Sequence, residues 1–292
     1  MNLLVKFNIL LILVFGAGLG AAAVISRQSL QADARAETVR QAALMMETML
    51  SARNYTTKQI QPLLVKQQEH QKSFLPQTVP AFAATENFLH LQASYPDYAY
   101  KEATLNPTNL RDRAVDWETD IINTFRNRPN EVKELVGERE TPTGRSLYLA
   151  RPIKANPPCL ECHSTPAEAP PSLVRHYGSN NGFGWQLGEI IGAQIVSVPM
   201  AVPFKMADEA FQRLMIGLSA VFAASLVVLD LALLITVVRP LRKISAMADQ
   251  ISLGQMDLPE LNVRGKDEIA VLASSFTRMR RSLERALSML EG

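Results

Sequence analysis

The sequence lacks the patterns that mark most enzymes and nucleic-acid-binding proteins. Its 292 residues carry a net charge of only +2, and no long basic stretch occurs, so nucleic acid is a poor candidate partner. It has no nucleophile elbow, phosphate-binding loop or helical zinc-protease motif. The sequence up to Gly292 contains no kinase or cyclase signature. We therefore expect a protein that is not an enzyme.

Two apolar runs interrupt an otherwise polar chain. Phe7–Ile25 has no charged side chain, and Leu214–Val238 has only Asp230. A helix of about 20 residues crosses the hydrocarbon core of a bilayer, so both runs predict membrane spans. The first could also be a cleaved signal peptide, although cleavable apolar cores are usually about 7–15 residues long. The second could be a buried core helix, but its length and the basic flank Arg239–Lys243 argue against this.

The two spans divide the chain into five expected segments. Because basic residues gather on the cytoplasmic side, Lys6 and the cluster Arg239–Lys243 place both termini in the cytoplasm. We expect a bacterial inner-membrane protein with a cytoplasmic N-terminus (1–6), a first span (7–25), a periplasmic domain (26–213), a second span (214–238) and a cytoplasmic relay segment (239–292).

The periplasmic segment reads as helices followed by strands, which predicts an α+β fold. In the long helix expected over Gln28–Lys72, one apolar stripe should pack against a neighbouring helix; it consists of Val39, Ala42, Met46 and Met49. Further elements are expected as helices at Ala81–Leu91 and Asp116–Arg126, strands at Tyr98–Leu105, Ser146–Ile153 and Ile190–Val198, and a loop at Pro157–Pro171. Pro152 suits an edge position in its strand.

The segment after the second span contains two heptad patterns separated by Gly254. The apolar positions of the first are Leu241, Ile244, Ala248 and Ile251; those of the second are Ile269, Leu272, Phe276, Met279, Leu283, Ala286 and Leu290. Neither helix can bury its apolar seam alone, so we expect a homodimeric parallel four-helix coiled coil. Two generic amphipathic helices are the alternative. Pro240 at the membrane exit and the Asp267–Glu268 pair at the start of the second helix argue against it.

The strongest motif is Cys159-Leu-Glu-Cys162-His163, which contains the only two cysteines of the chain. A C-x-x-C-H run indicates c-type haem attachment. Cys159 and Cys162 would each form a thioether to a haem vinyl group, and His163 would be an axial ligand of the iron. A thioredoxin-like redox pair is the main alternative, but the adjacent histidine and the proline-rich surroundings fit haem better. A structural zinc site is a further alternative, but it usually needs four ligands, and the sequence has no second Cys or His pair at the right spacing. We expect one covalent haem c, and its attachment outside the cytoplasm agrees with the two-span topology.

The sixth iron ligand stays open at the level of sequence. His70, His90 and His176 are the remaining histidines, and each taken singly is more often a surface or core residue than a ligand. A methionine, water or a vacant position are further alternatives. Haem potential and gas affinity depend on this choice.

Asp230 is the one charge within the second span. A charged group near the bilayer centre costs about 2.5–3.5 kcal/mol on insertion scales, so such residues usually face protein or water. Asp230 either reaches water or Arg239 near the interface, or faces the partner helix of a dimer and sets the rotation of the span.

About two thirds of the chain resembles known bacterial modules. Residues 51–200 resemble the c-type haem sensor domain with a PAS-like core, and Val238–Leu290 resembles a HAMP signal-relay domain with Pro240, Asp267 and Glu268 in their places. The marks of the first are Val79-Pro-Ala-Phe-Ala-Ala84, Tyr100–Asn109, Trp117-Glu118, Tyr148–Pro152, Cys159–His163, Tyr177-Gly178 and Gly182–Trp185.

The resemblance implies a haem-based sensor of redox state or of a small diatomic gas. Some family members use a cysteine as the sixth ligand, and this chain has no cysteine to spare. We expect the relay to act on a separate cytoplasmic signalling protein. The alternative is a membrane-anchored c-type cytochrome for electron transfer, but such a carrier needs no heptad relay.

Overall fold

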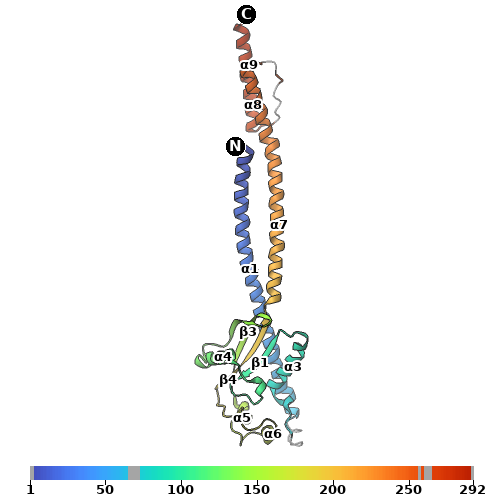
Figure 1. Cartoon of the computed structure of the whole chain (residues 1–292), viewed down its shortest axis with the longest axis vertical. Coiled ribbons are helices and arrows are strands. Elements are labelled where there is room, and N and C mark those ends of the chain that lie inside the picture. Colours follow the sequence, from blue (N-terminus) through green and yellow to red (C-terminus); the bar gives the residue numbers. More distant parts are fainter. Residues whose placement is uncertain (1–2, 65–72, 256–257, 260–264, 291–292) are drawn as a thin grey trace. The chain divides into compact units, whose positions relative to one another are not determined.

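The computed structural model describes residues 3–64, 73–255, 258–259 and 265–290 (Figure 1). The chain forms two compact units, one comprising residues 28–209 and the other comprising 1–27 and 210–292. His70 lies outside the described residues, and so do Leu261 and Val263 of the connector between the heptad helices.

The unit of residues 28–209 is built on a four-stranded antiparallel sheet of order β1-β4-β3-β2. The strands are β1 (Ala99–Thr104), β2 (Leu135–Thr141), β3 (Gly144–Lys154) and β4 (Ile190–Pro199). The three expected strands are confirmed. The sequence reading missed β2, because Leu-Val-Gly-Glu-Arg-Glu-Thr is mostly polar and its strand alternates only between half-buried and exposed positions.

Pro152 lies in β3 opposite Ala193 of β4. The other neighbour, β2, begins its pairing at Leu135 opposite Ala150 and does not reach Pro152. On the side of β2, the missing N–H of Pro152 therefore interrupts no hydrogen bonds between strands. The expectation that Pro152 occupies a local edge is confirmed.

Helices cover both faces of the sheet. On one face, the stripe Ala42, Met46 and Met49 of α1 (Leu3–Tyr55) is buried together with Phe88 of α3 (Pro80–Ser94). The sheet residues of this core are Leu147 and Leu149 from β3 and Val196 and Val198 from β4. The stripe is core, as expected, but its partner is the sheet as well as a helix.

The opposite face is covered by α4 (Asp116–Asn127). Its Ile121, Ile122 and Phe125 pack on residues of the sheet that alternate with the first set: Ala103, Ala150, Ala193 and Ile195. Because side chains point alternately to the two faces of a strand, β4 is buried on both sides. The result is a three-layer α+β domain with β4 at its centre.

The second unit contains the two apolar runs. Within the described residues, two helices are long and apolar enough to cross a membrane: Leu3–Leu64 and Ala201–Ser252. Hardly any side chain in their apolar windows is buried, and Leu13 is 65% and Ile216 71% exposed. Exposed apolar surface on this scale does not fit a soluble core helix, which favours contact with lipid.

The second of these helices consists of α7 (Ala201–Leu233), a π-helical segment (Leu234–Val238) and α8 (Arg239–Ser252). In the π segment the N–H of Arg239 donates to the carbonyl of Leu234 instead of following the α-helical pattern. Pro240 comes next and has no N–H to donate, so the helix is irregular at this junction for a physical reason. Asp230 is half-buried, and among the described residues its Oδ1 has no hydrogen-bond partner.

The two heptad helices are present as α8 and α9 (Glu268–Leu290), and Gly254 ends the first with a φ of +87°. Asp267 caps α9 because its Oδ1 accepts the N–H of Ala270 at 2.8 Å, and Glu268 lies in the first turn. Ile244, Ile251 and Ala273 are buried within one chain, whereas Met279 is 59% exposed.

Candidate haem site

The Cys159–His163 motif lies on a short helix, α5 (Pro157–His163), and not on the loop that we expected from its prolines. Asn156 caps this helix, because its side-chain oxygen accepts the N–H of Cys159 at 3.3 Å. Pro157 and Pro158 occupy the first turn, where a missing N–H costs nothing. The loop prediction for 157–171 was therefore wrong at its start, and α6 (Pro171–Tyr177) begins at its end.

The helix brings the three motif side chains to one side. Cys162 and His163 follow Cys159 by three and four residues, and side chains at these spacings are neighbours on a helix surface. Both thiols are free and half-buried, and the Sγ of Cys159 donates to Asn156 at 2.9 Å. Burial raises the pKa of the Cys162 thiol, and the nearby Glu161 and Cys159 add to this.

His163 is held in one orientation. Its ring stacks on the indole of Trp185, with centroids 3.9 Å apart and an angle of 17° between the planes. Its Nδ1 lies 2.7 Å from the carbonyl oxygen of Gly182 and 3.3 Å from the Oγ1 of Thr108. A carbonyl can only accept, so Nδ1 carries the proton and Nε2 keeps its lone pair. Burial lowers the pKa of His163, against the Gly182 hydrogen bond that raises it, so the ring is neutral near pH 7.

Two segments distant in the sequence build this clamp. The Oδ1 of Asn106 accepts the N–H of Gly182 at 3.1 Å, and its Nδ2 donates to the carbonyl of Phe183 at 3.3 Å. The N–H groups of Gly184 and Trp185 donate to the carbonyls of Ser164 and His163. The segment 182–185 is thus fixed both to the end of α5 and to the segment that follows β1.

Gly182 is the point of closest approach between these segments. Its φ is +83°, in the left-handed region that favours glycine. A Cβ at this position would lie 2.8 Å from the Cα and N atoms of Thr108 and closer still to its Oγ1. No side chain fits here without a shift of backbone.

Comparison with known proteins identifies both parts of the chain. The sequence model described as Tll0287-like (Tll0287) matches residues 29–199, which is more than half of the chain. The chain belongs to the Tll0287-like family. A HAMP domain model matches residues 232–285, so a HAMP domain follows the Tll0287-like domain.

One solved structure is similar to this chain, the crystal structure of the cyanobacterial heme-protein Tll0287. The similarity is at 13% sequence identity, covers 56% of this chain and 95% of that chain, and has a TM-score of 0.43. The curated proteins contain no match.

Among the described residues, the Tll0287-like domain brings neither His90 nor His176 to His163. His176 is exposed on α6, where its ring packs against Tyr177 at 4.5 Å and Phe74 at 5.6 Å. His90 is exposed on α3. In the part of the chain that the structure describes, neither of them contacts His163, and the sixth ligand stays unassigned.

A buried charge network in the Tll0287-like domain was missed from the sequence. Arg53 of α1 forms an ion pair with Glu102 of β1. The hydroxyl of Tyr100 donates to the other oxygen of Glu102 at 2.7 Å, and Gln194 of β4 donates to Tyr100 at 3.4 Å. The alternation of β1 could have indicated inward-facing polar side chains, but the partner Arg53 is about fifty residues away.

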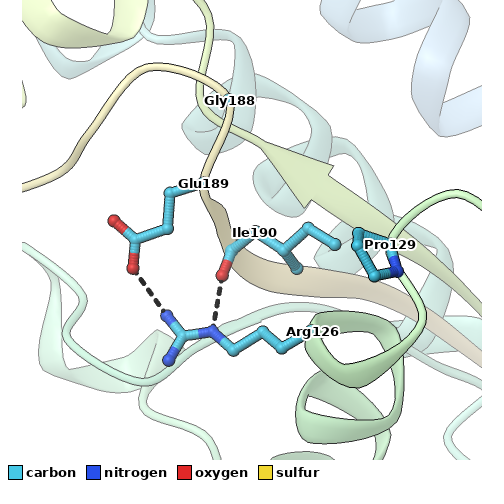
Figure 2. A pocket seen from close by; sticks show the side chains of 5 residues that line it. All are labelled: Arg126, Pro129, Gly188, Glu189 and Ile190. Carbon is cyan, nitrogen blue, oxygen red and sulfur yellow. Dashed lines mark hydrogen bonds and ion pairs between the residues drawn. The ribbon is translucent and has the colours of Figure 1, made fainter.

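A pocket of about 360 Å³ lies at the start of β4. Figure 2 shows its lining residues: Arg126, Pro129, Gly188, Glu189 and Ile190. The guanidinium of Arg126 donates to the carbonyl of Ile190 at 2.7 Å and pairs with Glu189 at 2.9 Å (Figure 2). Because Arg126 is engaged in this way, it serves to hold the start of β4 and offers no free charge to a ligand.

Proposed function

We propose that this protein is a membrane-bound haem c sensor that relays the state of its haem through the HAMP domain to a separate cytoplasmic signalling protein. The observation that carries the proposal is the orientation of His163. Its Nδ1 proton is fixed on a backbone carbonyl, which is how metal-binding histidines are usually held, and Nε2 is left as a ligand. Two free thiols on the same side of α5 complete a set that fits a covalent haem.

The residues have distinct roles in this proposal. Cys159 and Cys162 would hold the haem through thioethers, and His163 would bind the iron. Thr108, Gly182 and Trp185 keep the imidazole in place, and the hydrogen bond to Gly182 increases its basicity. The haem would supply a reversible one-electron couple and a position for a sixth ligand.

The relay follows from the order of elements. The segment that holds His163 leads into β4, and β4 leads directly into α7, which contains the second candidate membrane span. We propose that residues 26–213 are periplasmic and residues 239–292 cytoplasmic, since Arg239, Arg242 and Lys243 follow that span. The exposed seam residue Met279 supports a homodimer in which two copies complete the four-helix bundle.

A membrane-anchored cytochrome for electron transfer is the second candidate. The HAMP match at residues 232–285 favours the sensor, because electron transfer at the periplasmic face needs no cytoplasmic relay. Removal of residues 239–292 separates the two. Turnover with periplasmic electron carriers that survives the deletion would favour the carrier, whereas loss of a haem-dependent cytoplasmic response favours the sensor.

The haem assignment is tested by haem staining of denaturing gels. We expect weaker staining for Cys159→Ala or Cys162→Ala and none for the double variant, because each thiol makes one thioether. A double variant that still stains would refute the assignment. His163→Ala should retain some stain but change the visible spectrum in both oxidation states. The matched control is His176→Ala, an exposed histidine on α6 that does not contact His163 in the described part of the chain, which should leave staining intact.

A further inference from the structure

Arg280 of α9 is a buried charge in the HAMP domain. Its side chain is only 8% exposed, and among the described residues of 210–292 no other polar or charged residue is buried to this extent. Burial of a guanidinium costs free energy that an apolar side chain would avoid. The best-attested use of such a group is to fix one packing arrangement against another, so its contacts decide what Arg280 does.

The contact that holds Arg280 comes from the connector between α8 and α9. Its Nη1 donates to the backbone carbonyl of Leu258 at 2.7 Å, although the two residues are 22 positions apart in the sequence. Leu258 lies beyond Gly254, the residue that ends α8. A hydrogen bond from an ionised donor is stronger than one between neutral groups. Arg280 therefore ties the first part of the connector to α9.

The connector is stiff at the point where Arg280 holds it. Pro259 follows Leu258, and a residue before proline is largely restricted to extended conformations. Pro259 has a fixed φ of its own and no N–H to donate. The carbonyl of Leu258 therefore has few directions open to it, and one hydrogen bond orders this stretch at a small cost in conformational entropy.

Glu284 offers Arg280 a second partner. It lies one helical turn further along α9, and its Oε1 is 3.3 Å from the Nε of Arg280. That Nε is buried and has no hydrogen-bond partner among the described residues, so its N–H does not point at the carboxylate. The ion pair is thus only partly formed while Nη1 donates to Leu258. Because the guanidinium is a rigid fork, turning it fully toward Glu284 would draw it away from the carbonyl.

We propose that Arg280 is a latch that holds the HAMP connector on α9, and that Glu284 competes with the Leu258 carbonyl for its guanidinium. The domain then has two arrangements: the latched one, and a released one in which Arg280 pairs with Glu284 alone. A packed element with two discrete arrangements can be biased by a small input. The latch rests on the HAMP domain itself, whereas its use by the haem signal rests on the proposed function.

The test is the rate at which a maleimide labels Leu258→Cys in the full-length protein in membranes, read from the mass of the peptide that contains it. The latch binds a backbone carbonyl, so this substitution keeps it. Added Arg280→Met removes the donor and should speed labelling by roughly tenfold, because it favours local opening. Added Glu284→Gln removes the competing charge and should slow labelling by about twofold.

Two further variants separate a latch from ordinary stabilisation of α9. If Glu284 acts through Arg280, the double variant Arg280→Met/Glu284→Gln should label as fast as Arg280→Met alone. The matched control is Arg278→Met, because Arg278 donates to Ser274 and Ser275 of its own helix, and it should leave the rate unchanged. If Arg280→Met fails to fold, Glu284→Gln decides by its sign: slower labelling supports the latch, and faster labelling overturns it.

The outcomes distinguish this inference from the proposed function. Opposite effects of the two single variants, with the double variant following Arg280→Met, support the latch. Effects in the same direction, or no larger than that of Arg278→Met, overturn it and leave the haem assignment standing. A wild-type protein that fails to stain for covalent haem refutes the proposed function and leaves the latch standing.

Discussion

Substitution of Gly182 by alanine tests the clamp on His163 most directly. Gly182 accepts the Nδ1 proton of His163 through its carbonyl and has a φ of +83°. An alanine there must adopt a left-handed conformation, which costs about 1–2 kcal/mol. Its Cβ would also lie 2.8 Å from two backbone atoms of Thr108, and overpacking of this kind typically costs about 1–3 kcal/mol.

A matched control is available two residues further along the chain. Gly184 has nearly the same φ, +84°, but a Cβ there would meet no atom within 4 Å. Gly184→Ala should therefore show the conformational cost alone, about 1–2 kcal/mol. Gly182→Ala should cost about 2–5 kcal/mol, the sum of both effects.

Thermal unfolding of the full-length protein, followed by the haem absorbance, measures the difference. For a domain of this size, 1 kcal/mol corresponds to about 2–4 °C in Tm. We expect a fall of about 2–8 °C for Gly184→Ala and about 4–20 °C for Gly182→Ala. Only Gly182→Ala should also change the visible spectrum, because only it displaces the carbonyl that orients His163. Equal Tm values and unchanged spectra for the two variants would refute the clamp.

Two further predictions concern pH and assembly. Burial raises the pKa of Asp112 to about 6, because it outweighs the attraction of Arg111. The folded state thus holds this proton more tightly than the unfolded state, so stability should fall as the pH rises from about 4 to 6. Asp112→Asn should be more stable than wild type above pH 6, by at most about 3 kcal/mol, and a constant difference in denaturant midpoints at all pH values would contradict this. Single cysteines at Ile244 or Met279 should crosslink between subunits in membranes, and crosslinking no better than at the exposed Arg242 would argue for a monomer.

The regular elements could be predicted because their signals are local. The β-branched run that starts at Ile190 and the stripe of Met46 and Met49 follow from side-chain periodicity, which reads neighbouring residues only. Each of the two errors has its own local cause. In β2, charged residues hide the alternation of an edge strand. In α5, prolines that usually break helices occupy the one turn that tolerates them.

The site shows the same division between local and long-range information. The spacing of Cys159, Cys162 and His163 is visible in five consecutive residues, and α5 turns that spacing into one face of a helix. The partners of His163 come from positions 108, 182 and 185. These positions lie within the segments Tyr100–Asn109 and Gly182–Trp185, which carry the resemblance to the family. No pattern of neighbouring residues, however, predicts that the two segments are in contact. Only the pairing of β1 with β4 brings their ends together.

The pairing of β1 with β4 also predicts the path by which a displacement of the His163 ring would be transmitted to the rest of the chain: through the strands next to Thr108 and Trp185. Thr108 follows β1 and Trp185 precedes β4, and the two strands pair from Ala99 opposite Ser197 to Thr104 opposite Gly192.

The junction between β4 and α7 is equally well fixed. Met200 connects them, is almost fully buried, and donates its N–H to the carbonyl of Arg145 at 2.9 Å. No flexible linker separates the strand from the helix, so a displacement of the strand end must be passed on to α7.

The proposed relay requires that crosslinking of a single cysteine at Met279 differ between oxidised and reduced haem. Insertion of two glycines between Met200 and Ala201 should therefore leave haem staining and the spectrum unchanged, yet abolish this difference in crosslinking. The matched control is the same insertion after Gly254, in the connector beyond α8, which should leave the spectrum unchanged too but keep the redox-dependent change at Ile244. If the insertion after Met200 preserves the haem-dependent change, the signal does not travel through β4 into α7.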